Sequence, residues 1–253
     1  MDIGRGTPTV ADPLPATRDG LHRLAEHVLA AARYAATGHI GLTPAPGGFA
    51  TPPFGPEPTV LAVDLDEFVV SRGGQQHRTR IRTLAQVAKL AGIQPGAPEQ
   101  VYHPATPLDP QAPLEIDRDA ARLLADWYQL GAGALATFAA AVPGNAPTAA
   151  QLWPEHFDLA ITAARVNYGV SPGDDQIAEP YLYISPFDGA PAGTDQFWNA
   201  PFGAALRYPE VISPNRAVNF FHAGRDRLGR AASSAARHTG PQSTSGNHRP
   251  SDA

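Results

Sequence analysis

The sequence of 253 residues contains no cysteine, one methionine and a single lysine, Lys89, beside 18 arginines. Without cysteine the chain has no disulfide framework, no thiolate nucleophile and no cysteine-ligated zinc or iron–sulfur centre. A lysine nucleophile would have to be Lys89, which falls on a short predicted helix. No run of about 20 apolar residues is present, so no membrane span is predicted.

Two further absences concern location and partners. Residues 1–17 contain charges and prolines but no apolar core of a secretory signal, so a cytoplasmic location is expected. The net charge is −5 and the isoelectric point is near 6.0, so the chain lacks the basic footprint of a nucleic-acid-binding protein. An unknown small molecule is the expected partner, with no nucleic acid and no membrane, and the sequence does not indicate an oligomeric state.

The hydrophobic residues make up 43% of the chain, which is enough for a packed core. We predict one α+β domain over residues 17–230, in two halves of about 17–115 and 116–230. Residues 1–16 and 231–253 are predicted to be disordered, because they offer few large apolar side chains to offset the entropy of ordering.

Periodicity predicts antiparallel β meanders packed by a few helices, with sheets over about 39–82 and 156–186. Each half combines a helix with a meander, which suggests two similar halves. Gly73-Gly74 predicts a hairpin in which Val70 lies opposite His77. The glycines at 131 and 133 either allow close packing or break their helix. The predicted helices cover residues 18–36, 83–91, 117–142 and 214–223, and the proline-rich stretches 44–58, 95–113 and 186–201 are predicted to be irregular.

The segment 152–187 contains three alternating stretches, each typical of a half-buried strand. One face is apolar and the other presents polar and aromatic side chains. A concave surface of this kind is typical of a small-ligand pocket. The candidate ligand-binding residues are Trp153, His156, Asp158, Tyr181 and Tyr183.

Carboxylates near this face allow a second interpretation. On a strand, His156 and Asp158 would point the same way about 7 Å apart, and a hard metal or acid–base chemistry uses such groups. The candidate metal ligands are His156, Asp158, Asp174, Asp175 and Glu179. The simpler interpretation is that Asp174 and Asp175 serve a turn and that all these groups are solvated.

Two motifs are rejected as functional sites. The segment Gly169-Val170-Ser171-Pro172-Gly173 matches the nucleophile elbow of α/β-hydrolases, but Pro172 lacks the backbone N–H that an oxyanion hole needs. His22 and His27 are five residues apart and face apart on a helix, so with Glu26 they are predicted to be ordinary surface residues.

The segments Trp153…Phe157-Asp158-Leu159-Ala160-Ile161-Thr162 and Glu179-Pro180-Tyr181-Leu182-Tyr183, with Ser171-Pro172-Gly173 between them, resemble the C-terminal half of a bacterial family, domain-of-unknown-function family 5996. Fainter agreement covers much of residues 21–223. The sequence departs from the family where Pro44-Ala45-Pro46 stands in place of an aromatic strand. The resemblance implies a related fold and supplies no chemistry.

Two functional hypotheses follow. In the first, the chain is a small-ligand-binding or structural protein without catalysis, and the face of His156, Asp158, Tyr181 and Tyr183 is its site. In the alternative, it is a metal-assisted or acid–base enzyme, a hydrolase or isomerase, that uses the same strand face and the nearby carboxylates.

Overall fold

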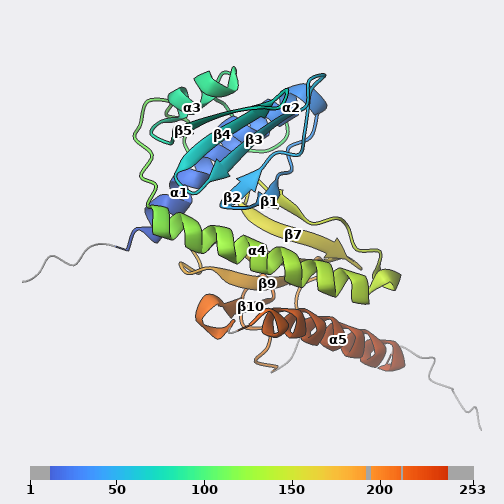
Figure 1. Cartoon of the computed structure of the whole chain (residues 1–253). Helices are drawn as coiled ribbons and strands as arrows, with labels where there is room; N and C mark the ends of the chain where they lie inside the picture. Colours follow the sequence, from blue (N-terminus) through green and yellow to red (C-terminus); the bar gives the residue numbers. More distant parts are fainter. Residues whose placement is uncertain (1–11, 192–194, 212, 239–253) are drawn as a thin grey trace, which may run out of the picture.

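The computed structural model describes residues 12–191, 195–211 and 213–238. Two five-stranded sheets, antiparallel throughout, are packed by helices (Figure 1), as the predicted α+β class requires. The first sheet, in the order β1-β2-β3-β4-β5, contains β1 (Thr43–Ala45), β2 (Gly48–Ala50), β3 (Thr59–Asp64), β4 (Glu67–Arg72) and β5 (Gln75–Arg80). The second, in the order β10-β9-β8-β7-β6, contains β6 (Gln151–Trp153), β7 (Asp158–Ala163), β8 (Val166–Ser171), β9 (Tyr181–Pro186) and β10 (Ala204–Arg207).

Each half of the chain has the same order of elements, a helix, a five-stranded meander and a second helix. The helices of the first half are α1 (Leu14–Leu24), which continues through a π-helical turn, η1 (Ala25–Ala30), into α2 (Ala31–Thr37), and α3 (Leu84–Ala91). Those of the second half are α4 (Arg118–Ala141) and α5 (Pro214–His238), with short 3-10 turns η2 (Pro143–Asn145) and η3 (Tyr208–Glu210). The two sheets are therefore similar in order as well as in size.

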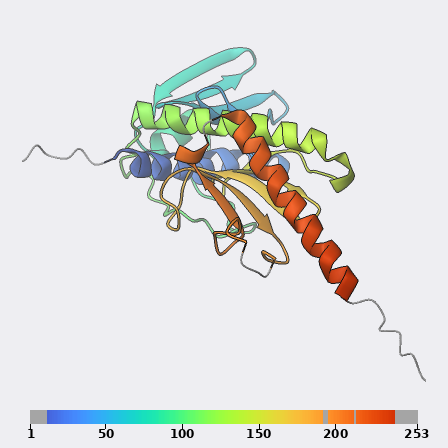
Figure 2. The same cartoon turned by 90° about the horizontal axis from the view of Figure 1, so that it is seen from below.

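The sheets meet at their edge strands. The N–H of Leu42 donates to the carbonyl of Leu152 at 2.8 Å, and the N–H of Leu152 donates back at 3.0 Å. The helix α4 contacts strands of both sheets, and α5 crosses α4 (Figure 2). This central helix and the edge bridge hold the two halves together.

The helix α4 is unbroken, so its glycines do not mark an end. A Cβ atom on Gly131 would lie 2.4 Å from a side-chain carbon of Val170, whereas one on Gly133 would meet nothing within 4 Å. Gly131 therefore allows close packing of α4 on β8, which was one of the two predicted explanations. Asp117 caps the start of this helix, because its carboxylate accepts the N–H of Ala120 at 2.9 Å.

The first sheet confirms the predicted hairpin register, with Val70 opposite His77 on β4 and β5. It corrects the prediction that residues 44–58 are irregular, because β1 includes Pro44 and β2 begins at Gly48. An edge strand tolerates proline because one side of it needs no ladder hydrogen bonds. The tight β1–β2 hairpin occupies the place where the sequence departs from the pattern of family 5996.

Other differences lie at the ends of elements. Both β6 and β10 fall outside the predicted sheets. The helix α5 continues to His238, so the first residues of the predicted tail are helical, and α1 begins at Leu14, within the predicted disordered N-terminus. The rest of those two predictions, residues 1–11 and 239–253, lies outside the described residues.

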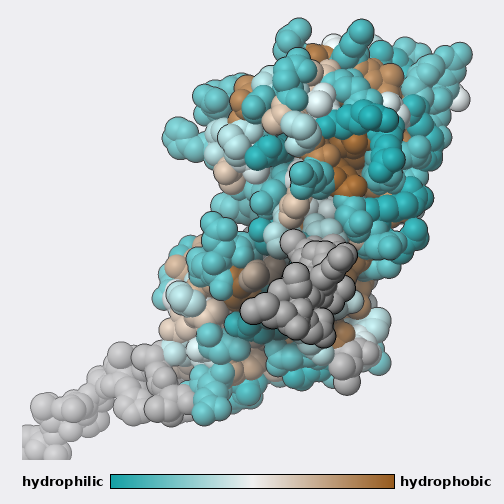
Figure 3. All heavy atoms as spheres, turned by 90° about the vertical axis from the view of Figure 1, so that its left-hand side faces the viewer, coloured by the Kyte–Doolittle hydropathy of each residue, from teal (hydrophilic) through white to brown (hydrophobic). Residues whose placement is uncertain are grey.

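Hydrophilic residues predominate on the face drawn in Figure 3, where apolar ones are exposed only in limited areas. The large hydrophobic residues that are exposed lie apart in the sequence, at Val101, Leu108, Phe187 and Tyr208. None of the described helices combines the length and apolar character that crossing a bilayer requires.

Candidate functional site

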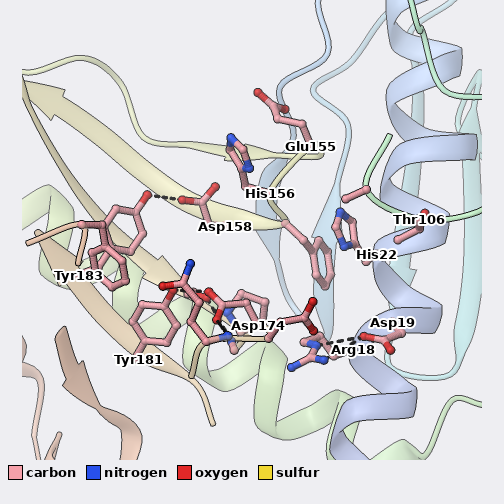
Figure 4. Close-up of a pocket in the computed structure, with 18 of the residues that line it drawn as sticks. Arg18, Asp19, His22, Thr106, Glu155, His156, Asp158, Asp174, Tyr181 and Tyr183 are labelled. Atoms are coloured by element: carbon pink, nitrogen blue, oxygen red, sulfur yellow. Dashed lines mark hydrogen bonds and ion pairs between the residues drawn. The ribbon is translucent and has the colours of Figure 1, made fainter. Parts of the chain in front are cut away.

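A cleft of about 680 Å³ lies between α1 and the polar face of the second sheet. Its third wall is the loop of residues 96–107 after α3, called the strap below, which contributes Ala105, Thr106 and Pro107. The first half of the chain therefore supplies one side of the cleft and the second half the other. Figure 4 shows side chains from both halves pointing toward this space.

The strands β7, β8 and β9 place the central side chains by their register. Tyr183 on β9 lies opposite Gly169 on β8. A Cβ atom on Gly169 would lie 2.2 Å from the Tyr183 ring, so the missing side chain lets the ring lie across β8. The Tyr183 hydroxyl thereby reaches Asp158 on β7 and donates a hydrogen bond to its Oδ2.

Asp158 is a buried carboxylate with one unused oxygen. Only 7% of the residue is exposed, and no donor in the described part of the chain bonds its Oδ1. Burial raises the pKa of Asp158 to about 6, while the Tyr183 hydrogen bond and the nearby His156 act in the opposite direction. Burial and the charge of Asp158 also raise the pKa of Tyr183 well above 10, so this phenol stays a donor.

A second tyrosine–carboxylate pair lies beside the first. The Tyr181 hydroxyl donates to Asp174 at 2.5 Å, and the other oxygen of Asp174 accepts the N–H groups of Gln176 at 2.7 Å and Ile177 at 2.8 Å. The Tyr181 ring stacks on Phe202 with centroids 6.0 Å apart. The turn residue Asp174 is thus fully engaged, and the tyrosine rings form an aromatic wall.

The turn between β6 and β7 is held by α1 and α4. His22 donates from Nε2 to the carbonyl of Pro154 at 2.8 Å, and its ring stacks on Phe157 at 5.1 Å. Tyr128 on α4 donates to the carbonyl of Phe157 at 2.5 Å. Burial lowers the pKa of His22, although Glu26 opposes this effect. These contacts fix a turn in which Phe157 has the left-handed φ of 53°.

That turn corrects the predicted position of His156. The strand β7 begins at Asp158, so His156 is exposed on the preceding turn and does not share a strand face with Asp158. It nevertheless lines the cleft, and its charge acts on Asp158. The left-handed Phe157 interrupts the alternation that the sequence pattern assumed.

The strap buries two polar residues that were predicted to lie on the surface. Glu26 is 0% exposed and accepts hydrogen bonds from the N–H of Ala105 at 2.8 Å and from the N–H and hydroxyl of Thr106 at 2.9 and 2.5 Å. His27 is 1% exposed, and its Nδ1 accepts the N–H of Ala97 at 3.1 Å while its Nε2 lies 3.1 Å from the Thr106 carbonyl. The surface prediction was wrong because the strap covers this face of the helix.

Three buried side-chain atoms of the described chain have no hydrogen-bond partner: Asp158 Oδ1, Glu155 Oε2 and the hydroxyl of Tyr102. Asp158 and Glu155 line the cleft, whereas Tyr102 lies on the strap outside its lining. Buried polar atoms are normally paired, so two unpaired acceptors in one cleft indicate a site prepared for a donor from outside the chain.

Most of the predicted site residues come together. The cleft is lined by His156, Asp158, Asp174, Asp175, Tyr181 and Tyr183. Trp153 is half-buried on β6 outside its lining, and Glu179 is paired with Arg207 at 2.7 Å. Ser171 lines the cleft at the end of β8, and its hydroxyl accepts the N–H of Gly173 at 3.1 Å, which suits a turn. Within the described ranges, no three His, Asp or Glu side chains form a group that could hold a metal ion.

No local pattern in the sequence indicated the residues that α1 and the strap contribute to the cleft. Arg18 donates to Asp19 at 3.1 Å and approaches the carbonyl of Ala178 at 3.5 Å, and with His22 it closes one side of the cleft. Arg18 and His22 are more than 130 positions from β7 in the chain, and the strap residues are about 50 positions from it, so the contacts are long-range in sequence.

Comparisons with models of protein families, with curated proteins and with solved structures gave no match for this chain. The resemblance to family 5996 therefore stays a prediction. The function has to be argued from the geometry of the cleft itself.

Proposed function

We propose that the cleft between α1 and the second sheet binds a small organic molecule, and that Asp158 is the group that meets it. The observation that supports this most directly is the unpaired Oδ1 of Asp158 in a residue that is only 7% exposed. Leaving a buried acceptor unpaired costs about 1–3 kcal/mol, and more for a charged group, so a partner supplied by a ligand would recover that cost.

The size and the composition of the cleft agree with this proposal. Pockets for small molecules measure about 300–1,000 Å³ and combine apolar or aromatic walls with a few convergent polar groups. Here the volume is about 680 Å³, and Tyr181, Tyr183 and Phe202 supply the aromatic wall. Asp158 supplies the polar centre beside Tyr183 (Figure 4).

A thermal-shift screen of a small-molecule library tests the proposal. A ligand present at 100 times its dissociation constant stabilises the native state by about 2.7 kcal/mol, which raises the melting temperature of a chain of this size by about 5–10 °C. We expect library compounds that shift the wild-type protein and fail to shift Asp158→Asn. The matched control is Asp126→Asn, an exposed position on α4, which should respond like the wild type. A screen without hits, or hits that bind all three proteins equally, would count against the proposal.

A second function is favoured by one further observation. Burial raises the pKa of Asp158 to about 6. A group whose pKa lies near the working pH can both accept and return a proton, as general acid–base catalysis requires. His156 and Tyr183 lie beside it, and a perturbed carboxyl in a cleft is a candidate acid or base. We therefore keep an acid–base enzyme, an isomerase or hydrolase, as the alternative. The absence of a three-residue metal group among the described residues leaves the metal-assisted form without structural support.

The alternative has its own test. A mixture of metabolites is incubated with the wild-type protein or with Asp158→Asn and followed over time by liquid chromatography with mass spectrometry, since chromatography separates isomers of equal mass. An enzyme would convert at least one compound in the wild-type sample alone, whereas a binding protein would convert none. A cytoplasmic location and membership of family 5996 belong to the same set of proposals and rest on the sequence alone.

A further inference from the structure

We infer that the ligand of this cleft carries a protonated amine or guanidinium group, which donates to Asp158 and lies against the aromatic wall of Tyr181, Tyr183 and Phe202. The inference deepens the proposed binding function and rests on it. Three features of the cleft lead to it: its hydrogen-bonding capacity, its charge and its aromatic wall.

The cleft has spare acceptors, while several of its donors are already used. Asp158 Oδ1 and Glu155 Oε2 are buried acceptors without a partner in the described chain. Two phenol donors are already used within the protein, since Tyr181 donates to Asp174 and Tyr183 donates to Asp158. A ligand that offers several N–H groups satisfies such a site, whereas one that offers only acceptors does not.

Two of the basic side chains in the lining are also engaged. His22 uses Nε2 on the carbonyl of Pro154 at 2.8 Å, and Arg18 is paired with Asp19 at 3.1 Å. The donors of these two side chains are therefore directed at the protein itself, while Arg23 and His156 complete the basic part of the lining.

The charge of the lining favours a cation. Two arginines line the cleft, Arg18 and Arg23, against five carboxylates. The carboxylates are Asp19, Glu155, Asp158, Asp174 and Asp175. Among the lining residues that the structure describes, one arginine lies within 4.0 Å of a carboxylate of the lining: Arg18 is paired with Asp19. The lining therefore carries more carboxylates than arginines, and one of these carboxylates, Asp158, is buried where screening by solvent is weak.

The aromatic wall suits the same kind of ligand. Phe202 stacks on Tyr181 and meets the edge of Tyr183 at 6.2 Å, so three rings lie together beside the carboxylate. The faces of aromatic rings attract cations, and the pairing of such rings with a carboxylate is how ammonium groups are commonly recognised. A neutral polyol would use the spare acceptors but would gain nothing from the charge.

The experiment compares probes that differ in one group. Tyramine, its alcohol analogue 4-(2-hydroxyethyl)phenol and its acid analogue 4-hydroxyphenylacetate share a ring, and putrescine, 1,4-butanediol and succinate form the ring-free series. Calorimetric titration at pH 7.5 should show the amine of at least one series binding about tenfold or more tightly than its alcohol, because hydrogen bonds to a charged partner are the stronger kind. Asp158→Asn should abolish this preference, while Asp126→Asn should retain it.

The pH dependence supplies a second readout. The titratable groups that face Asp158 are Tyr128 from α4, Glu155 and His156 from the preceding turn, and Tyr181 and Tyr183 from β9. With a pKa of about 6, about a tenth of Asp158 is ionised at pH 5, so the amine should bind about tenfold more weakly there than at pH 7.5. Tyr183→Phe keeps the ring but removes a hydrogen bond that lowers this pKa, so it should move the transition to higher pH even if Asp158→Asn fails to fold.

The outcomes separate the inference from the proposed function. An alcohol or acid probe that binds as well as the amine overturns the inference and leaves the binding function in place. If none of the six probes binds, the hits of the thermal-shift library test the inference instead. Hits that depend on Asp158 and carry a cationic nitrogen support the inference, and hits that depend on Asp158 but lack one overturn it. A library without any hit removes the proposed function and the inference together.

Discussion

Asp158→Asn should change how the stability of the protein depends on pH. Burial raises the pKa of this carboxyl from its ordinary value of 3.8 to about 6 in the folded protein. The unfolded chain therefore releases the proton first, and raising the pH between these two values favours unfolding. The stabilisation from protonated Asp158 is fully present below about pH 3.8 and is lost as the pH rises through about 6.

The magnitude follows from the two pKa values. The difference between 3.8 and about 6 corresponds to about 3 kcal/mol of unfolding free energy, at about 1.4 kcal/mol for each pH unit within the window. Asparagine does not titrate, so the variant lacks this loss. The substitution also changes packing and the Tyr183 hydrogen bond, which shifts the free energy of unfolding by the same amount at every pH. The test therefore rests on how the difference between the two proteins changes with pH.

Urea unfolding followed by tryptophan fluorescence measures both proteins between pH 4 and pH 8. The stability of Asp158→Asn relative to the wild type should rise by about 2.5 kcal/mol across this range and level off above pH 7, because part of the loss has already occurred at pH 4. His156 lowers the pKa of Asp158, so in a His156→Gln background the rise should be larger and should extend to higher pH. A stability difference that stays constant from pH 4 to pH 8, or that falls, would refute the assignment of Asp158 as a buried group with a raised pKa.

Three further variants test the packing around the cleft by chemical unfolding. Glu26→Gln puts an amide N–H₂ against the N–H groups of the strap and should lower the free energy of unfolding by about 2–3 kcal/mol. The exposed control Glu115→Gln should change it by less than about 0.5 kcal/mol, and equal effects would contradict the buried role of Glu26. Gly131→Ala should cost about 1–3 kcal/mol through overpacking, whereas Gly133→Ala should stabilise α4 by up to about 1 kcal/mol, and a gain at both positions would contradict the close approach to β8. Tyr128→Phe leaves a buried carbonyl without its donor and should cost about 1–3 kcal/mol, so a neutral result would show that this bond is unimportant.

Local patterns were sufficient for the polar face of the second sheet. Alternation placed Tyr181 and Tyr183 on the side opposite Leu182, and the structure has Leu182 in the core and both tyrosines in the cleft. The same pattern placed Asp158 on that face. It failed at His156, because the left-handed Phe157 interrupts the strand and a positive φ at a large apolar residue has no signature in the sequence.

Long-range burial could not be predicted in this way. Helical spacing gave Glu26 and His27 the appearance of surface residues, yet the strap that buries them comes about 80 positions later. The proline-rich composition of that loop predicted an irregular cover but not the surface it covers. The short strands β6 and β10 were missed for a related reason, since three or four residues are too few to show a period and their pairing depends on neighbouring strands.

The two buried carboxylates of this region can be told apart by their hydrogen bonds. Glu26 accepts three bonds from the strap, so its burial is compensated by the protein and its role is to hold the strap in place. Asp158 accepts a bond from Tyr183 on one oxygen and none in the described chain on the other. The fold thus leaves a desolvation cost uncompensated in a cleft with an aromatic wall, to which both halves of the chain contribute. A bound donor is the partner that would offset this cost. Glu26 holds the strap in place, and the strap forms one wall of the cleft. The carboxylate whose hydrogen bonds are complete, Glu26, therefore shapes the site in which Asp158 has an oxygen free to accept a bond from a ligand.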